Sequence, residues 1–286
     1  MNQIFIRIQG GLGNQLFQYA FARSLSEKGV GVFLHWHPAK KNEQHDGLLL
    51  DAIFKNRLTD IIPLANRSIA RSAMAFMFRK LSRVRQLGDV GFDKRFYEVK
   101  NGYIDGYFQS EKYFNNLRSE LRQDLDLPFE EKNYPSFLAK VTKEHLCVAI
   151  HVRGGDYLKI NGLNQVCGSI YYQNAIHRIS SDYRDENIKF IVFTDDMAWT
   201  KKVLPGGIDY IFASNFPGST TGVDFALMKT CDAHIISNST FSWWGAWLSD
   251  SVSVIMPDRW YISDSLSSNN DIKPNDWHEV PSDYLL

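Results

Sequence analysis

The feature that most constrains the fold of this chain is the alternation of short apolar runs, rich in β-forming residues, with segments of helical spacing. The first apolar run covers 4–8 and ends at two glycines; a helical pattern follows as far as Gly29, and a second strand is expected at 30–34. A strand, a glycine turn, a helix and a second strand are how a parallel α/β sheet begins. The chain is therefore predicted to be an α/β protein.

A second series of the same kind begins at residue 146. Between the two series, the stretch 115–145 is charged and carries two prolines, which favours a domain boundary near residue 140. Two successive halves of similar size predict two Rossmann-like domains, 1–140 and 141–286, that face each other across a cleft. In the second half, strands are expected at 146–151, 190–194, 210–213, 233–237 and 252–256, and helices at 169–178, 225–231 and 241–248.

The composition excludes several classes of protein. The 286 residues carry 32 Lys and Arg against 32 Asp and Glu, and a neutral chain lacks the basic surplus that general nucleic-acid binding requires. No apolar run approaches the roughly 20 residues of a membrane span, and the N-terminus lacks the pattern of a signal peptide. The three cysteines, Cys147, Cys167 and Cys231, form neither a disulfide framework nor a zinc-ligand set. We expect a cytoplasmic protein without a nucleic-acid partner.

The stretch 61–88 is distinguished by its charge, because it carries six basic residues and no acidic one. Apolar side chains lie between the basic ones, which predicts a basic amphipathic helix or a pair of helices. Two interpretations are open for its central part, 67–85. Either it is a surface helix of the first domain, or it holds the protein against the inner face of a membrane with anionic lipids.

Glycines separate the first strand from the first helix. Gly10, Gly11 and Gly13, followed by Asn14, let the backbone approach a phosphate or a sugar with a helix N-terminus behind it. The pattern completes neither the dinucleotide fingerprint nor a phosphate-binding P-loop. The alternative is a tight turn between strand and helix without a ligand.

A polar segment follows the strand expected at 146–151. It contains His151, Arg153, the pair Gly154–Gly155 and Asp156. Ligands of α/β proteins bind at the carboxyl ends of strands, and a guanidinium fork there suits a diphosphate. The alternative is an Arg–Asp ion pair at the strand end.

Two further strand ends carry polar residues. Asp195 and Asp196 are adjacent, unlike the spaced acids of metal-dependent sugar transferases, so we expect a helix N-cap and hydrogen bonds to ligand hydroxyls. Asp224 opens a helix, and the hydroxyl-rich turn 237–242 precedes the next one, which is an anion-binding arrangement. Trp243 and Trp247 share a helix face, for core packing or for stacking on a sugar.

Five segments together resemble the bacterial α-1,2-fucosyltransferases, which are inverting glycosyltransferases that use GDP-fucose. They follow the order of that family and span nearly the whole chain: GGLGNQLFQYAFARSL at 10–25, GYFQSEKYF at 106–114, HVRGGDY at 151–157, IVFTDD at 191–196 and DFALMKTCDAHIISNSTFSWWGAWLS at 224–249.

The resemblance implies a GT-B architecture, in which the second of two Rossmann-like domains binds most of the donor and the first lies on the acceptor side. We expect the last helix to pack back on the first domain. The implied substrates are GDP-fucose and a galactose-containing oligosaccharide, the implied pathway is surface polysaccharide synthesis, and neither a cofactor nor a metal ion is expected.

The resemblance also implies roles for single residues. Arg153 would hold the β-phosphate of the donor, His151 would lie beside the nucleotide, and Asp224 would bind guanine. Ser239 and Thr240 would hold phosphate oxygens. With Asp195 included, the expected donor-binding residues are Gly11, Gly13, Asn14, His151, Asp195, Asp224, Ser239 and Thr240, and the expected catalytic residues are Arg153 and Asp156.

One position departs from the family's pattern. The usual motif is His-x-Arg-Arg-Gly-Asp, and here Gly154 stands in place of the second arginine, while Arg153 is retained. If the loss only weakens donor binding, an arginine restored at this position lowers the KM for GDP-fucose. No change, or a folding defect, indicates a rebuilt loop. Asp156 is a candidate general base, or else it orients Arg153.

The expected reaction moves L-fucose from GDP-β-L-fucose to O2 of a galactose residue, with inversion. Two alternatives are open. One is a protein that binds a GDP-sugar or a glycan with impaired turnover, which the glycine at position 154 suggests. The other is a related transferase of different linkage or donor.

Overall fold

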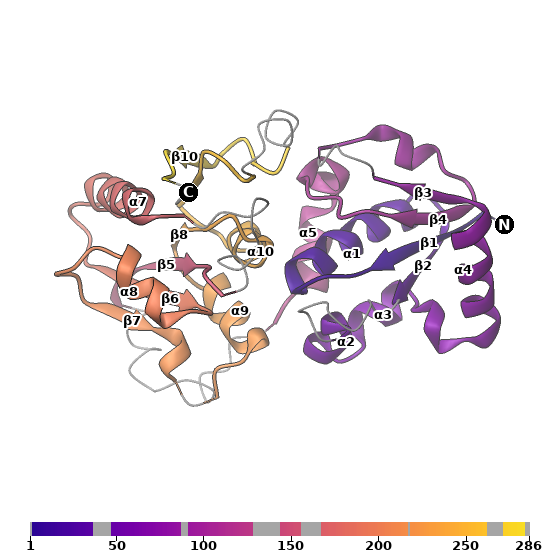
Figure 1. Ribbon diagram of the computed structural model, residues 1–286, viewed down its shortest axis with the longest axis horizontal. Helices are drawn as coiled ribbons and strands as arrows, with labels where there is room; N and C mark the ends of the chain where they lie inside the picture. Colours follow the sequence, from indigo (N-terminus) through magenta and orange to yellow (C-terminus); the bar gives the residue numbers. More distant parts are fainter. Residues whose placement is uncertain are drawn as a thin grey trace. The chain divides into compact units, whose positions relative to one another are not determined.

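The chain divides into two compact units in the computed structural model, which describes residues 2–36, 47–86, 91–127, 144–155, 167–216, 218–261 and 271–283 (Figure 1). The first unit is Met1–Asp126 with Ser268–Pro274, and the second is Leu127–Ser267 with Asn275–Leu286. The boundary that we expected near residue 140 falls in 128–143, outside the described residues.

The first unit is built on a parallel sheet of four strands in the order β2-β1-β4-β3. Its strands are β1 (Gln3–Ile8), β2 (Gly31–Trp36), β3 (Arg83–Arg85) and β4 (Gly102–Asp105), and its helices are α1 (Leu12–Ser26), α2 (Leu49–Phe54), α3 (Arg57–Ile61), α4 (Ile69–Leu81) and α5 (Arg118–Asp124). Short 3-10 helices lie at Ala65–Arg67, Lys94–Glu98, Glu111–Tyr113 and Asn115–Leu117. The helix α1 is buried along most of its length, which explains its high content of apolar and small residues.

The basic stretch 67–85 forms a helix followed by a strand, so the prediction of one helix or two is only partly right. The helix α4 begins after Ser68, whose hydroxyl accepts a hydrogen bond from the backbone of Arg71, and ends at Leu81. Arg83 and Arg85 lie in β3, paired in parallel with β4. Sheet pairing with a distant strand explains this ending, which local helical spacing does not reveal.

The second unit is built on a parallel sheet of six strands in the order β10-β9-β8-β5-β6-β7. Counted along the chain, this is the 3-2-1-4-5-6 order of a Rossmann fold, with the reversal point between β5 and β8. The strands are β5 (Leu146–Val152), β6 (Ile188–Thr194), β7 (Tyr210–Phe212), β8 (Ala233–Ile235), β9 (Ser253–Pro257) and β10 (His278–Val280), and the helices are α7 (Ser169–Asp182), α8 (Met197–Val203), α9 (Thr221–Lys229) and α10 (Thr240–Leu248), with a 3-10 turn at Ala213–Asn215.

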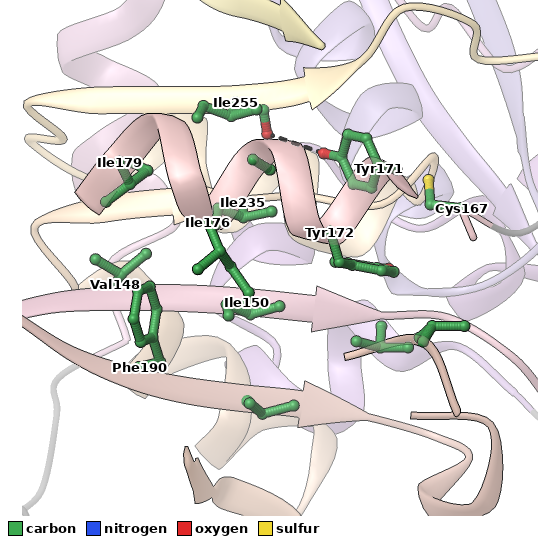
Figure 2. Close-up of a cluster of buried hydrophobic side chains, with 14 of the residues drawn as sticks. Val148, Ile150, Cys167, Tyr171, Tyr172, Ile176, Ile179, Phe190, Ile235 and Ile255 are labelled. Atoms are coloured by element: carbon green, nitrogen blue, oxygen red, sulfur yellow. Dashed lines mark hydrogen bonds between the residues drawn. The ribbon is translucent and has the colours of Figure 1, made fainter. Parts of the chain in front are cut away.

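The second sheet is covered by apolar side chains on both faces. Figure 2 shows α7 on one face of the sheet, where Tyr171, Tyr172 and Ile176 belong to one cluster of buried side chains. The Tyr171 hydroxyl donates to the backbone oxygen of Ile255 at 3.3 Å. Burial of each such side chain contributes about 1.5–3 kcal/mol. On the other face, side chains of α9 such as Leu227 complete a second cluster.

The expectation that the last helix packs back on the first domain stays a prediction, because residues 262–270 and 284–286 lie outside the described residues. Residues 271–283 contain the strand β10 and no helix. The stretch Ser268–Pro274 groups with the first unit, where Lys112 Nζ lies 2.6 Å from Asp271 Oδ1. In the described part of the chain, no helix is both long enough and apolar enough to pass through a membrane.

Candidate functional site

The reversal point of the second sheet brings polar side chains of β5 and of the turn after β8 together. His151, near the end of β5, has its Nδ1 atom 2.9 Å from Ser237 Oγ and 2.9 Å from Ser242 Oγ. Ser237 follows β8, and Ser242 lies in the first turns of α10. Because open α/β sheets bind ligands outside the carboxyl ends of the strands at this point, the region is a candidate ligand site.

The imidazole of His151 is neutral at neutral pH. Burial, and then the neighbouring Arg153, lower its pKa to about 3. The Tyr172 hydroxyl donates to the backbone oxygen of His151 at 2.9 Å, which fixes the strand end from the α7 side. His151 can therefore offer a ligand a hydrogen bond but no positive charge.

The positive charge at this edge comes from Arg153. Its Nη1 atom lies 2.8 Å from Asp195 Oδ2, and the backbone N–H of Gly154 donates to Asp195 Oδ1 at 2.9 Å. The two side chains are 21% and 29% exposed, so the pair is open to a ligand. The strand-end Arg–Asp pair that we considered as an alternative is thus present, and its acid comes from the end of the neighbouring strand β6.

Asp196, next to Asp195, is a helix-capping residue. Its carboxylate accepts a hydrogen bond of 2.9 Å from the backbone N–H of Trp199 and caps the N-terminus of α8. The predicted helix N-cap is confirmed. Asp195, by contrast, holds Arg153 and the backbone after β5.

Gly154 and Gly155 let this backbone pass close to its neighbours. A Cβ atom at position 154 would lie 2.9 Å from Asp196 Cβ and 3.0 Å from Trp199 Cδ1. A Cβ atom at position 155 would lie 2.4 Å from Asp195 Oδ2. Because real Cβ contacts are longer, larger residues at either position require the loop to move.

The N-terminus of α10 differs from those of α8 and α9 in its capping. Asp196 caps α8 and Thr220 caps α9 through their side chains, whereas the Ser239 side chain makes no capping hydrogen bond to α10. Ser239 is buried and Thr240 is half-buried. Backbone N–H groups, hydroxyls and the helix dipole at this end can hold an anion.

Asp224 lies in the first turn of α9, and its two carboxylate oxygens accept hydrogen bonds of 2.8 and 3.0 Å from Ser219 Oγ. Burial raises its pKa, and the Ser219 hydrogen bond opposes this shift. Aromatic rings connect α9 to His151. Phe225 of α9 contacts Phe241, and Phe241 contacts the ring of His151, each at 5.6 Å between ring centroids.

The tryptophans of α10 belong to the core. Trp243 and Trp247 are fully buried and stack on each other at 5.9 Å between ring centroids. The core-packing interpretation is confirmed, since a fully buried ring has no face for a sugar.

Gly11, Gly13 and Asn14 lie in the first unit, where Gly11 is the N-cap of α1 and Gly13 and Asn14 belong to the first turn of that helix. Gly10 adopts a φ of +77°, which favours glycine, and Asn14 Oδ1 accepts a hydrogen bond of 2.8 Å from Gln109 Nε2. The turn has the close strand-to-helix geometry that the glycines predicted.

Two sets of partners were not foreseen from the sequence. Ser237 and Ser242 hold His151, and Ser219 holds Asp224. The hydroxyl-rich composition of these turns was the available signal. Asp156 lies outside the described residues. No group of three or more His, Cys, Asp or Glu side chains that could hold a metal ion occurs among the residues described.

Comparison with known proteins gives the family. The model of glycosyl transferase family 11 matches residues 74–280. An alpha-1,2-colitosyltransferase of Escherichia coli is 32% identical over 98% of this chain and 99% of its own length. The O-antigen biosynthesis glycosyltransferase WbnK of the same species is 28% identical over 91% of this chain and 95% of its own. Galactoside alpha-(1,2)-fucosyltransferase 1 of Mus musculus is 25% identical over 60% of this chain and 52% of its own.

These matches show that the chain, with its two parallel α/β units and a polar strand edge in the Rossmann-like unit, is a glycosyltransferase. It belongs to glycosyl transferase family 11. The resemblance seen in the sequence and the predicted α/β class with parallel sheets are confirmed.

Proposed function

We propose that this enzyme transfers L-fucose from GDP-β-L-fucose to O2 of a galactose residue in a glycan, with inversion at the fucose C1. The observation that carries the proposal is the Arg153–Asp195 pair beside the reversal point of the second sheet. The names of the relatives support the transfer of a 6-deoxy sugar to a galactoside and a role in O-antigen synthesis.

In this reaction the C1–O bond breaks largely before the acceptor bonds, and negative charge collects on the departing diphosphate. The Arg153 guanidinium meets that charge in a fixed position, because Asp195 holds it. The uncapped N-terminus of α10, with Ser239 and Thr240, takes further phosphate oxygens. Fixed groups of this kind stabilise the leaving diphosphate without a metal ion, which is the mode that we propose.

The remaining sequence-derived roles complete the proposal. His151, as a neutral donor or acceptor, lies beside the nucleotide. The second domain holds GDP-fucose, and the first contributes Gly11, Gly13 and Asn14 from the acceptor side. Asp156 is the candidate general base.

The test is incubation of the purified protein with GDP-fucose and lactose, with and without EDTA, followed by NMR assignment of the product linkage. We expect an α-1,2-fucosylated galactose in both samples. Binding of GDP-fucose without product favours a glycan- or nucleotide-binding protein, and another linkage favours a related transferase.

A second donor is favoured by one finding, the 32% identity to a colitosyltransferase. Colitose is L-fucose without the 3-hydroxyl, so the two donors share the GDP group and most of the sugar. A kcat/KM that is higher for GDP-colitose than for GDP-fucose in the same assay moves the assignment to this sugar.

Asp224 gives the proposal a pH dependence. Its carboxylate is to accept the two N–H groups on the edge of guanine, and it does so only when ionised. Because burial raises the pKa of Asp224, GDP affinity should fall with decreasing pH earlier than an ordinary aspartate, with a pKa of about 3.9, would allow. Calorimetric GDP titrations across pH measure this, and Asp224→Asn should bind GDP about tenfold more weakly at pH 7, with a flatter profile.

The same substitution should stabilise the fold at pH 7. A carboxyl pKa that is higher in the folded than in the unfolded state gives stability at low pH, which is lost as pH rises through the folded value. Asparagine does not ionise, so Asp224→Asn avoids the loss of stability that occurs when the buried carboxyl is charged at pH 7. The exposed Asp209, changed to Asn, is the charge-matched control and should alter neither GDP affinity nor its pH profile. An unchanged GDP affinity in Asp224→Asn contradicts the role in guanine binding.

We further propose that α4 contacts a membrane with anionic lipids. Its inner side packs Ala75 against the first sheet, while Ile69 and Leu81 on its outer side are 93% and 77% exposed. Phe76 and Met77 are exposed as well, and Lys80 lies among them. An exposed apolar helix face with basic neighbours fits the interface of an anionic bilayer.

Co-sedimentation with vesicles tests this contact. We expect binding to phosphatidylglycerol vesicles at low salt, little binding to phosphatidylcholine, and loss of binding in Ile69→Ser/Leu81→Ser. Val252→Ser, at an exposed apolar position in the second unit, is the control. Absence of binding at low salt, or a dimer that the double variant dissociates, contradicts the proposal.

A further inference from the structure

Near the carboxyl edge of the first sheet, Asp105 at the end of β4 gathers charged side chains that the reaction described above does not use, one of them from the first residue of β3. Arg7 on β1, Asp105 on β4 and Arg83 on β3 come from three neighbouring strands. Asp105 Oδ2 lies 3.5 Å from Arg7 Nη1 and also accepts a hydrogen bond from Arg83 Nη2. Its other oxygen, Oδ1, accepts a hydrogen bond of 3.2 Å from Gln9 Nε2.

The charges in this group do not balance. The side chains of Arg7 and Arg83 are 17% and 19% exposed, and that of Asp105 is 9% exposed. Both Nε atoms are buried without a hydrogen bond. Among the residues that the structure describes, Asp105 is the acid in ion pairs with these arginines, so two largely buried guanidiniums share one carboxylate. Because buried charges in proteins are usually paired, the surplus points to an anion from outside the chain.

The position of the group is one where parallel sheets bind ligands. In the order β2-β1-β4-β3, β2 lies on one side of β1 whereas β4 and β3 lie on the other, so the chain changes sides of β1 after β2. β1 continues through Gln9 into the glycine turn, and β4 continues into the loop 106–109. Gln18 joins the two: its Oε1 accepts from Gln9 N at 2.9 Å, and its Nε2 donates to Gly106 O at 3.2 Å. Arg7 and Asp105 therefore lie at the same sheet edge as the glycine turn, and the Arg83 side chain reaches Asp105 from the start of β3.

The loop after β4 is strained at this edge. Phe108 is fully buried and adopts a φ of +56°, in the left-handed region. The backbone N–H groups of Tyr107 and Phe108 donate to one acceptor, Gln86 Oε1, at 3.0 and 3.1 Å. Strained residues that their surroundings hold in place cluster at ligand sites. The backbone strain at Phe108 does not depend on the charges, and it lies at the same carboxyl edge of the first sheet.

We propose that Arg7 and Arg83 bind an acidic group, a carboxylate or a phosphate, on the acceptor glycan, so that this transferase prefers an anionic acceptor. The inference rests on the proposed function for the reaction itself. Guanidiniums on β1 and β3, the two strands that flank β4, can each hold two oxygens of such a group, and the sheet fixes their positions. Asp105 keeps both side chains in place before the acceptor arrives.

The experiment uses two galactosides that differ in one group. Lactobionate carries a carboxylate where lactitol carries a hydroxymethyl group. With GDP-fucose, we expect kcat/KM to be about tenfold higher for lactobionate, through KM, and the preference to shrink at high salt. Arg83→Gln should abolish the preference and Arg83→Lys should keep part of it. Arg95→Gln, at an exposed arginine paired with Asp93, should keep all of it.

A binding measurement separates this inference from the proposed function. Inorganic phosphate is titrated calorimetrically into the GDP-saturated protein, in which the donor site is filled. Binding that Arg83→Gln weakens and Arg95→Gln does not supports the anion site, even if no fucose is transferred. Fucose transfer to both acceptors at equal kcat/KM, with phosphate binding absent or unaffected by Arg83→Gln, overturns the inference and leaves the proposed function intact.

Discussion

Replacement of Arg153 by alanine should lower kcat for fucose transfer by about 10²–10³, with a small change in thermal stability. The guanidinium is the fixed positive group that meets the charge on the departing diphosphate, and Asp195 holds it at 2.8 Å. The ion pair is partly exposed, so its loss costs roughly 0–1 kcal/mol of folding free energy. Arg153→Lys should recover little activity, because an ammonium group lacks the two-pronged geometry.

Steady-state kinetics and thermal unfolding of the same preparations check this result. Arg178→Ala is the matched control, since Arg178 also pairs with one carboxylate, that of Asp182, on the surface of α7. The control should retain full activity. Turnover of Arg153→Ala close to that of the unchanged protein would remove the basis for placing the diphosphate at this edge.

Gly154→Arg should lower kcat/KM about tenfold or more, although it restores the residue usual in the family. A Cβ atom at this position meets Asp196 Cβ at 2.9 Å and Trp199 at 3.0 and 3.1 Å, so the backbone must move away from α8. That movement breaks the hydrogen bond from Gly154 N to Asp195 and disturbs the carboxylate that holds Arg153. Overpacking of this kind typically costs about 1–3 kcal/mol.

Gly154→Ala separates the two causes, because it adds the Cβ atom without the guanidinium. We expect it to lose activity as well, while Gly206→Arg, at a glycine with open space around its Cβ position, should be neutral. A lower KM for GDP-fucose in Gly154→Arg would instead mean that the missing arginine only weakens donor binding. The close packing at Gly154 favours a rebuilt loop.

Local sequence patterns predicted most elements of both sheets to within a few residues. The alternation of apolar runs with helical spacing set the strands around Ile4, Val148 and Val192, because side-chain periodicity is a property of neighbouring residues. The N-cap at Asp196 was predictable for the same reason. The strands β3 and β10 were missed, because only pairing with β4 makes Arg83–Arg85 a strand and only pairing with β9 makes His278–Val280 one.

The sequence predicted that the polar residues of the candidate site follow the ends of strands. It did not predict which of these residues contact one another. Arg153 and Asp195 are far apart in the sequence, and their pairing depends on β5 and β6 being neighbours in the sheet. The serines that hold His151 come from the turn after β8 and from α10. Strand order is a long-range property that residue patterns do not encode directly.

The sequence by itself determined the α/β class, the division into two halves, and which residue types follow each strand, since these depend on periodicity and on turn residues close in the chain. Only the tertiary structure decided which charges meet. It paired Arg153 with Asp195, gave Arg7 and Arg83 a single carboxylate, and turned Ile69 and Leu81 outward on α4. Burial and charge pairing depend on side chains that the folded chain brings together from distant strands and helices.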